Sequence, residues 1–206
     1  MPVFAIAKIN LRHNITFHIE VCAAILIITP ILYGTANLDT ASAAAPLEMF
    51  LSFIGIVLLT PVFAPEQNPG TGDLVASKTV STLTVYLIRM ICAVILTILL
   101  IGLFSAYMRL QKSDVTLLLF IGTVANAVFL GSLGMMTSAL TDNTIIAYMI
   151  PLVYYALNYG MGNKLGHYFL FSMRISDFEP KLWLLTTGIL LVFLSLIVKW
   201  YKKRLQ

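Results

Sequence analysis

Six long apolar runs, separated by short polar segments, constrain this chain more than any other feature of its sequence. They cover residues 17–36, 47–63, 85–108, 115–139, 144–160 and 182–200. A helix needs roughly 20 mostly apolar residues to cross the hydrocarbon core of a bilayer, and the shortest runs lie at the low end of the workable range. The runs therefore predict an all-α integral membrane protein in which six transmembrane helices form one domain over the 206 residues.

The composition supports lipid as the surrounding solvent. Hydrophobic residues make up 59% of the chain and charged residues only 11%, against about 45–50% and about 25% in soluble domains. The net charge of +4 is small, and no basic face is large enough to predict nucleic-acid binding. The histidines fall on opposite faces of the expected membrane topology, and no paired carboxylates share one depth. We therefore expect no enzyme activity and no catalytic, cofactor-binding or metal-binding residues.

An even number of spans places both termini on one side of the membrane. The C-terminal segment contains Lys199, Lys202, Lys203 and Arg204. Because positively charged residues favour the cytoplasmic side, both termini are predicted to be cytoplasmic. Residues 1–16 are predicted to form an interfacial helix, with a frayed terminus as the alternative.

Two charged residues are predicted near the inner interface. Arg89 follows the start of the third span, where it either extends to the interface or pairs with Glu66 or Asp73. Glu20 lies near the inner end of the first span. An ionisable residue inside a span is by default a candidate functional residue, and the alternatives are that Glu20 reaches the interface or pairs with Arg12.

One polar segment, residues 64–84, is more elaborate than a plain linker. Proline and glycine residues end the second span, and Thr71 can cap a short helix with Asp73 in its first turn. Leu74 is available for packing, and Ser81 or Thr82 can cap a second helix that enters the third span. A passive cytoplasmic loop is the alternative interpretation.

Two stretches resemble the permease subunits of type-2 ATP-binding-cassette (ABC) exporters. The first, "PEQNPGTGDLVASKTVSTLTVYLIRM", resembles the loop after the second span of that family, except that Thr79 replaces a usual proline and Thr82 a usual arginine. The second, "GSLGMMTSALTDNTIIAYMIPLVYY", resembles its closely linked fourth and fifth spans. The number of spans, the loop sizes and the basic C-terminus also fit, so the resemblance covers nearly the whole chain.

The resemblance implies that the segment after the second span forms a coupling helix for a separate ABC ATPase. The coupling residues implied are Glu66, Gly70, Thr71, Asp73, Leu74, Ser77 and Ser81. Since the chain has no G-x-x-x-x-G-K-[ST] loop, ATP and Mg²⁺ are expected on that partner. A second permease, identical or diverged, would complete a dimer in a bacterial plasma membrane. The cargo class is amphipathic: a small peptide, a lipid or a drug-like compound.

Polar and aromatic residues recur on one face of the fifth span. They are Tyr148, Pro151, Tyr155 and Asn158, with Tyr159 beside them. We interpret Tyr148, Tyr155, Asn158 and Tyr159 as a candidate substrate path, with interfacial anchoring and packing as the alternative. In the family, the loop at 161–181 holds short re-entrant helices that act as an outer gate.

Other features have simpler interpretations. The fourth span carries small residues at Ala127, Gly131, Gly134 and Ser138, a pattern typical of close helix packing. Asp39 and Glu48 are predicted to be solvated in an outer loop. The alternative for the whole protein is a motorless channel, secondary transporter or scaffold.

Overall fold

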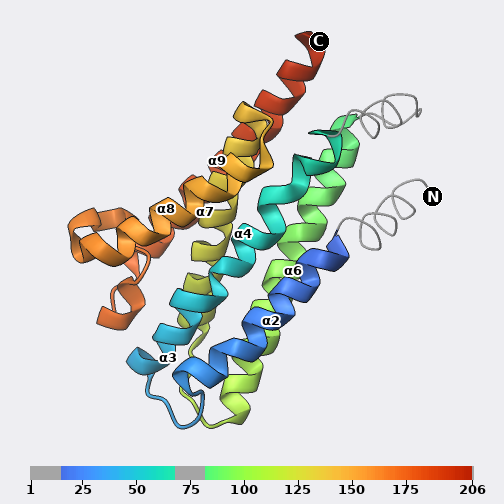
Figure 1. Ribbon diagram of the computed structural model, residues 1–206. Coiled ribbons are helices and arrows are strands. Elements are labelled where there is room, and N and C mark those ends of the chain that lie inside the picture. Colours follow the sequence, from blue (N-terminus) through green and yellow to red (C-terminus); the bar gives the residue numbers. More distant parts are fainter. Residues whose placement is uncertain (1–14, 68–81, 206) are drawn as a thin grey trace.

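The computed structural model describes residues 15–67 and 82–205, which form helices joined by short turns with no strand among them (Figure 1). The first half contains α2 (Thr16–Tyr33), α3 (Thr40–Pro46), η2 (Leu47–Leu51), α4 (Phe53–Leu59) and η3 (Thr60–Gln67). The second half contains α6 (Thr82–Leu110), α7 (Leu117–Thr141), α8 (Thr144–Met161), η4 (Gly162–Tyr168), η5 (Ser172–Ile175) and α9 (Glu179–Leu205). The predicted all-helical class is confirmed for these residues.

Five helical segments in the described part are long and apolar enough to cross a membrane. They are Thr16–Tyr33, Thr40–Pro65, Leu83–Leu110, Leu117–Thr141 and Glu179–Arg204. Each overlaps a predicted span. The remaining predicted span, 144–160, coincides with α8, which is a helix but is not among those five. The sixth crossing therefore stays a prediction, and the predicted interfacial helix at 1–16 lies almost wholly outside the described residues.

The second predicted span is longer than expected and irregular. It runs over Thr40–Pro65 rather than 47–63. Within it, α3 passes into the π-helical turn η2, and α4 passes into the 3-10 helix η3. Because a π turn widens the helix by one residue per turn, it rotates the side chains that follow. Glu48 lies in this turn.

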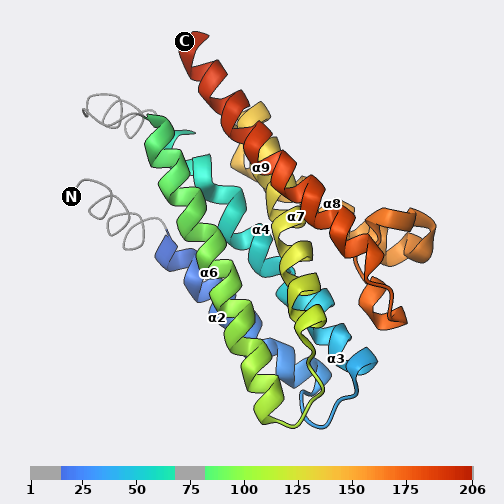
Figure 2. The same ribbon diagram turned by 180° about the vertical axis from the view of Figure 1, so that it is seen from behind.

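The helices Thr40–Pro65 and α7 form the centre of the bundle. They are the most buried of the five apolar segments, and α2 is the least buried. α9 runs along α7 (Figure 2), and α8 leans away from α7 toward one side of the molecule. Many large apolar side chains on α2, α6 and α9 are exposed, as expected for helices that face lipid.

Close contact between α4 and α7 depends on glycine. A Cβ on Gly55 would stand 1.8 Å from the carbonyl oxygen of Ala127, and one on Gly131 would stand 2.5 Å from the oxygen of Gly55. A Cβ on Gly134 would stand 2.1 Å from Thr60 Oγ1. The predicted packing role of the small residues on the fourth span is confirmed at these contacts.

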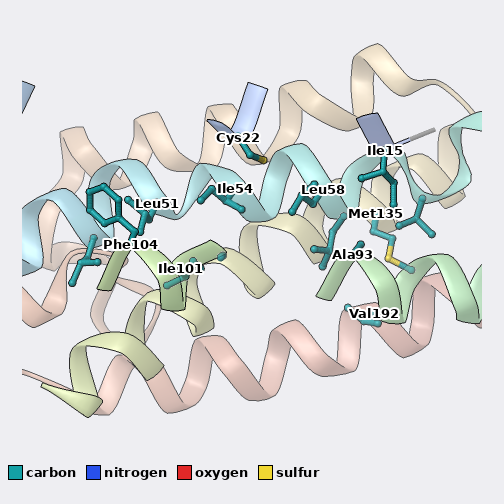
Figure 3. Close-up of a cluster of buried hydrophobic side chains, with 14 of the residues drawn as sticks. Ile15, Cys22, Leu51, Ile54, Leu58, Ala93, Ile101, Phe104, Met135 and Val192 are labelled. Carbon is teal, nitrogen blue, oxygen red and sulfur yellow. The ribbon is translucent and has the colours of Figure 1, made fainter. Parts of the chain in front are cut away.

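Apolar side chains from five of the long segments meet between these helices. Figure 3 shows Cys22 of α2, Ile54 and Leu58 of α4, Ile101 of α6 and Met135 of α7 in one cluster, which Val192 of α9 joins. Such packing fixes how the helices sit against one another and so where their few polar side chains meet.

Two ends of the bundle can be distinguished. α2 begins, η3 ends, α6 begins and α9 ends at one end, which we call the tail end (top of Figure 1). The turn from α7 to α8 also lies there. The loops 34–39 and 111–116 lie at the other end, which we call the loop end (bottom of Figure 1).

Candidate functional site

Most of the predicted coupling residues lie outside the described part of the chain. They are Gly70, Thr71, Asp73, Leu74, Ser77 and Ser81. Glu66 is described only as part of the backbone of η3. Their coupling role stays a prediction. The structure describes the two helices that flank these residues. η3 ends at the tail end, and α6 begins there.

The two predicted interface charges differ in exposure. Glu20 is exposed on α2, whereas Arg89 of α6 is buried, with 8% of its surface exposed. Arg89 therefore lies within the bundle rather than extending into solvent. The sequence suggested Arg12 as a partner for Glu20, and Glu66 or Asp73 as a partner for Arg89. Arg12, Asp73 and the side chain of Glu66 lie outside the described part of the chain.

The polar face of α8 packs inward in part. Tyr155 donates a hydrogen bond to the carbonyl oxygen of Met49 (2.9 Å), and its ring lies 4.5 Å from that of Phe53. Asn158 is fully buried, and Tyr148 packs against a second apolar cluster that includes Phe129 and Leu130. Tyr159 is 67% exposed. The first three side chains thus hold α8 against the bundle, which leaves Tyr159 as the exposed member of the predicted path.

The structure buries a charged pair that the sequence did not predict. Glu48 Oε1 lies 2.5 Å from Lys181 Nζ, and both side chains are 0% exposed. The prediction that Glu48 is solvated is therefore wrong. Asp39, predicted alongside it, is exposed, so that prediction is confirmed. Removing two charges from solvent is costly, so the pair must be held by other polar groups.

Those groups come from four different segments. Lys181 of α9 also donates to Asn126 Oδ1 of α7 (3.0 Å) and to the carbonyl oxygen of Leu170. Asn126 Nδ2 donates to the same Leu170 oxygen (2.8 Å). Asn158 Oδ1 of α8 accepts from the Leu170 amide (2.8 Å). Glu48 Oε1 accepts from the Met173 amide (3.0 Å).

We call Glu48, Lys181, Asn126 and Asn158 the polar clamp. The clamp gathers a carboxylate, an ammonium and two amides around the backbone of one connecting segment.

The sequence did contain a signal that Glu48 lies inside a helix rather than in a loop. The stretch "TASAAAP" before it is made of small residues that extend the helix upstream, so Glu48 lies more than two turns inside Thr40–Pro65. Its partners are far away along the chain, and no local pattern reveals them.

The segment that the clamp holds was predicted as an outer gate loop, 161–181. It contains the short 3-10 helices η4 and η5, and η5 contacts α3. An open pocket of about 210 Å³ lies beside it, lined by Gly166, His167, Phe169, Ile175, Asp177, Glu179 and Pro180. His167 Nδ1 is 3.6 Å from Glu179 Oε1, and both side chains are largely exposed. The short helices are present, while re-entry into the membrane stays a prediction.

A second charged cluster lies at the tail end. Asp142 adopts a left-handed conformation (φ 51°) after α7, and Asn143 caps α8 by accepting from the amides of Ile145 and Ile146. Lys199 and Lys202 both pair with Asp142, the latter at 2.5 Å. The very short turn predicted after the fourth span is confirmed between α7 and α8, and it is joined to the basic end of α9.

The electrostatics of this cluster favour an ionised carboxylate. Partial burial acts to raise the pKa of Asp142, but the hydrogen bonds and charges of Lys199 and Lys202 outweigh it and hold the pKa below the usual 3.8. Within residues 15–67 and 82–205, no group of three or more His, Cys, Asp or Glu is placed to hold a metal ion.

No family model matches the chain, and no curated protein or solved structure matches it either. The likeness to type-2 exporter permeases therefore rests on residues 65–90 and 131–155 of the sequence itself.

Proposed function

We propose that this chain is the transmembrane permease subunit of a type-2 ABC exporter. It works as a dimer, with an identical or diverged second permease, above two separate ATPase subunits that bind ATP and Mg²⁺. Its cargo is amphipathic: a small peptide, a lipid or a drug-like compound. The membrane is a bacterial plasma membrane with the tail end in the cytoplasm.

One observation carries the proposal. The segment that resembles the family's coupling loop connects the end of η3 to the start of α6, and both of these helix ends lie at the tail end. The basic residues at the end of α9 and the short α7–α8 turn lie at that same end. A coupling helix must face the cytoplasm, where ATP is, and a basic end is typical of the cytoplasmic side.

In the proposed mechanism, rigid helices transmit movement from the ATPases to the centre of the bundle. The short helix at about 71–78 seats in a groove on the ATPase, and closure of the ATPases moves it. Because η3 continues the central segment Thr40–Pro65 and α6 packs on that segment, the movement is passed to the centre of the bundle. The two permeases rock against each other, and access to the path between them alternates.

The coupling segment can be tested directly. Asp73→Arg with Leu74→Arg places two bulky cations where a carboxylate and an apolar contact are expected, so ATPase association and transport should both be lost while the chain stays inserted. Asp39→Arg, an exposed position at the loop end, is the matched control and should keep both. Unchanged association and transport in the Asp73/Leu74 variant would refute the coupling role.

The polar clamp favours a second candidate, a motorless secondary transporter. Ionisable groups inside membrane-spanning segments mark ion and proton pathways, and Glu48 and Lys181 are such groups. Vesicles that contain this chain, prepared with and without the co-purified ATPase, decide between the two. Proton-driven uptake of a cargo without ATP, abolished in Glu48→Gln, would support the motorless candidate, whereas uptake that requires the ATPase and ATP supports the exporter.

A further inference from the structure

The outer face of α9 changes from apolar to aromatic to basic toward its C-terminal end. Exposed apolar side chains recur three or four residues apart, so they form one stripe along the helix. The stripe consists of Leu190, Phe193, Leu194 and Ile197. Trp200 and Tyr201 are also exposed and continue the stripe, and the exposed Lys203 and Arg204 end it. One helix face therefore presents three kinds of side chain in order.

The spacing of two tryptophans indicates how deep this face lies in a bilayer. Trp183 and Trp200 are 17 residues apart on α9, which corresponds to about 26 Å along a helix. The hydrocarbon core is about 30 Å thick, and Trp and Tyr gather at its two boundaries. Trp200 and Tyr201 therefore lie at the boundary on the side of the tail end. Arg204 is about 6 Å farther along the helix, at the depth of the lipid headgroups.

Two of the four cations between Lys199 and Arg204 hold the helix to the bundle. Lys199 and Lys202 both pair with Asp142. They are three residues apart, so they share the inner face of α9. The single carboxylate of Asp142 cannot balance two ammonium groups, and the charges of Lys203 and Arg204 add to the excess. This stretch of α9 therefore carries positive charge where the headgroups lie (Figure 2).

The geometry of Arg204 suits a phosphate group. Its guanidinium carbon lies 3.9 Å from the centre of the Trp200 ring. Stacking covers one face of the planar guanidinium, whereas its N–H groups point outward in the plane and can still donate. Such N–H groups match the oxygens of a phosphate in a bidentate pair. Lys203 supplies a second cation next to it in the chain.

We propose that the outer face at the end of α9 binds an anionic phospholipid. The acyl chains lie along the apolar stripe, the glycerol lies at the level of Trp200 and Tyr201, and the phosphate pairs with Lys203 and Arg204. A lipid fits this face better than a soluble protein does, because only a lipid matches the apolar stripe, the aromatic rings and the cations together. The inference holds whether or not the chain is an exporter.

The chain has only two tryptophans, which makes the site measurable. In Trp183→Phe, Trp200 is the reporter within the proposed site. The full chain is placed in phosphatidylcholine vesicles, and increasing amounts of phosphatidylglycerol or phosphatidylcholine with brominated acyl chains are included to quench the fluorescence. Trp200 should prefer the brominated phosphatidylglycerol at least about fivefold, since each cation near an anionic surface contributes about that factor. The preference should weaken as salt is raised.

Charge variants in the same Trp183→Phe chain test which residues carry the preference. Lys203→Gln with Arg204→Gln should bring it close to one. Both positions are exposed, so the substitutions should leave the bundle folded. Lys112→Gln with Lys164→Gln is the matched control, because it removes two exposed cations that lie away from the tail end. This control should keep the full preference.

The second tryptophan provides a control that needs no charge variant. In Trp200→Phe, the reporter is Trp183 at the other end of α9, where the preference should stay below about twofold. Equal quenching of Trp200 by the two lipids would overturn the inference. So would a preference that survives the loss of Lys203 and Arg204, or one that is as strong at Trp183. Equal quenching by the two lipids, together with shielding of Trp200 by the co-purified ATPase, would assign this face to the protein partner instead.

Discussion

Glu48 and Lys181 show how a charge can remain inside an apolar bundle. Each is 0% exposed at its side chain, and each has its partner and a backbone group within hydrogen-bond reach. Replacing a whole buried pair by neutral residues is often nearly neutral for stability, whereas removing one partner costs about 3–5 kcal/mol. The two residues should therefore behave as a unit under mutation.

A double-mutant cycle, which compares the free energies of unfolding of the variants, tests this prediction. Lys181→Met leaves Glu48 buried and unpaired, and the free energy of unfolding should fall by about 3–5 kcal/mol. Adding Glu48→Gln removes the unpaired charge and should recover more than half of that loss. Thermal unfolding in detergent, followed by tryptophan fluorescence, gives the comparison. Additive losses in the double variant would show that the two side chains do not stabilise each other.

Asp142 makes a pH-dependent contribution to stability. Its pKa is lowered in the folded chain, so the contribution is fully present above the unfolded value near 3.8 and is lost as pH falls through the folded value. Wild type should be more stable than Asp142→Asn by a constant margin from pH 7 to about pH 5. The margin should close below about pH 3.8. Midpoints of thermal unfolding across this range provide the measurement, and a margin that grows on acidification would contradict the assignment.

Single residues explain what the sequence could and could not predict. The packing of Gly131 and Gly134 followed from their spacing to other small residues, because each lies four residues from one (Ala127 and Ser138) and residues four apart share a helix face. The burial of Glu48 did not follow, because it depends on Lys181 and on the backbone at 170–173, which only the folded chain brings near. For the same reason, Asn158 was placed on the correct face of α8 without its partner.

Among the elements, the contact between α4 and α7 is the most demanding. Gly55→Ala places a methyl group 1.8 Å from the Ala127 oxygen, and backbone atoms cannot move aside cheaply. We expect a loss of stability at or above the upper end of the roughly 1–3 kcal/mol that overpacking costs. Gly160→Ala is the matched control, since nothing lies within 4 Å of the added methyl in that helix.

The two glycine variants are compared by their unfolding midpoints in the same detergent. Gly160→Ala should be neutral or slightly stabilising, because alanine favours helix. Equal midpoints for Gly55→Ala and Gly160→Ala would mean that α4 and α7 do not approach as closely as described.

Element boundaries were predictable where turn-forming and helix-capping residues interrupt the apolar runs. The two-residue turn between α7 and α8 was recognisable in "TDNT", and Asn143 caps α8 as such a residue should. The start of the second span was missed, because the threonine, serine and alanine residues of α3 are less apolar than the run that begins at Leu47, although their small side chains suit a helix. The extra length there is what brings Glu48 into the bundle.

Among the described residues, two charged clusters each join several helices, one at the tail end and one farther toward the loop end. Asp142 joins α7, α8 and α9 at the tail end, and the polar clamp joins η2, α7, α8 and α9 toward the other. Between them the helices meet through apolar side chains. In the proposed exporter, the cluster at the tail end would lie on the side of the ATPase, and the polar clamp would lie toward the opposite side.

The most direct test of the proposed function is the composition of the native complex. The tagged chain is extracted from its own membranes in several mild detergents, and the proteins that accompany it are identified and quantified. The exporter proposal predicts an ABC ATPase in a one-to-one ratio with the permease chains. It also predicts that the ATPase is lost when Asp73 and Leu74 are replaced by arginine. A chain that is recovered alone, or only with itself, in every detergent would contradict the proposal.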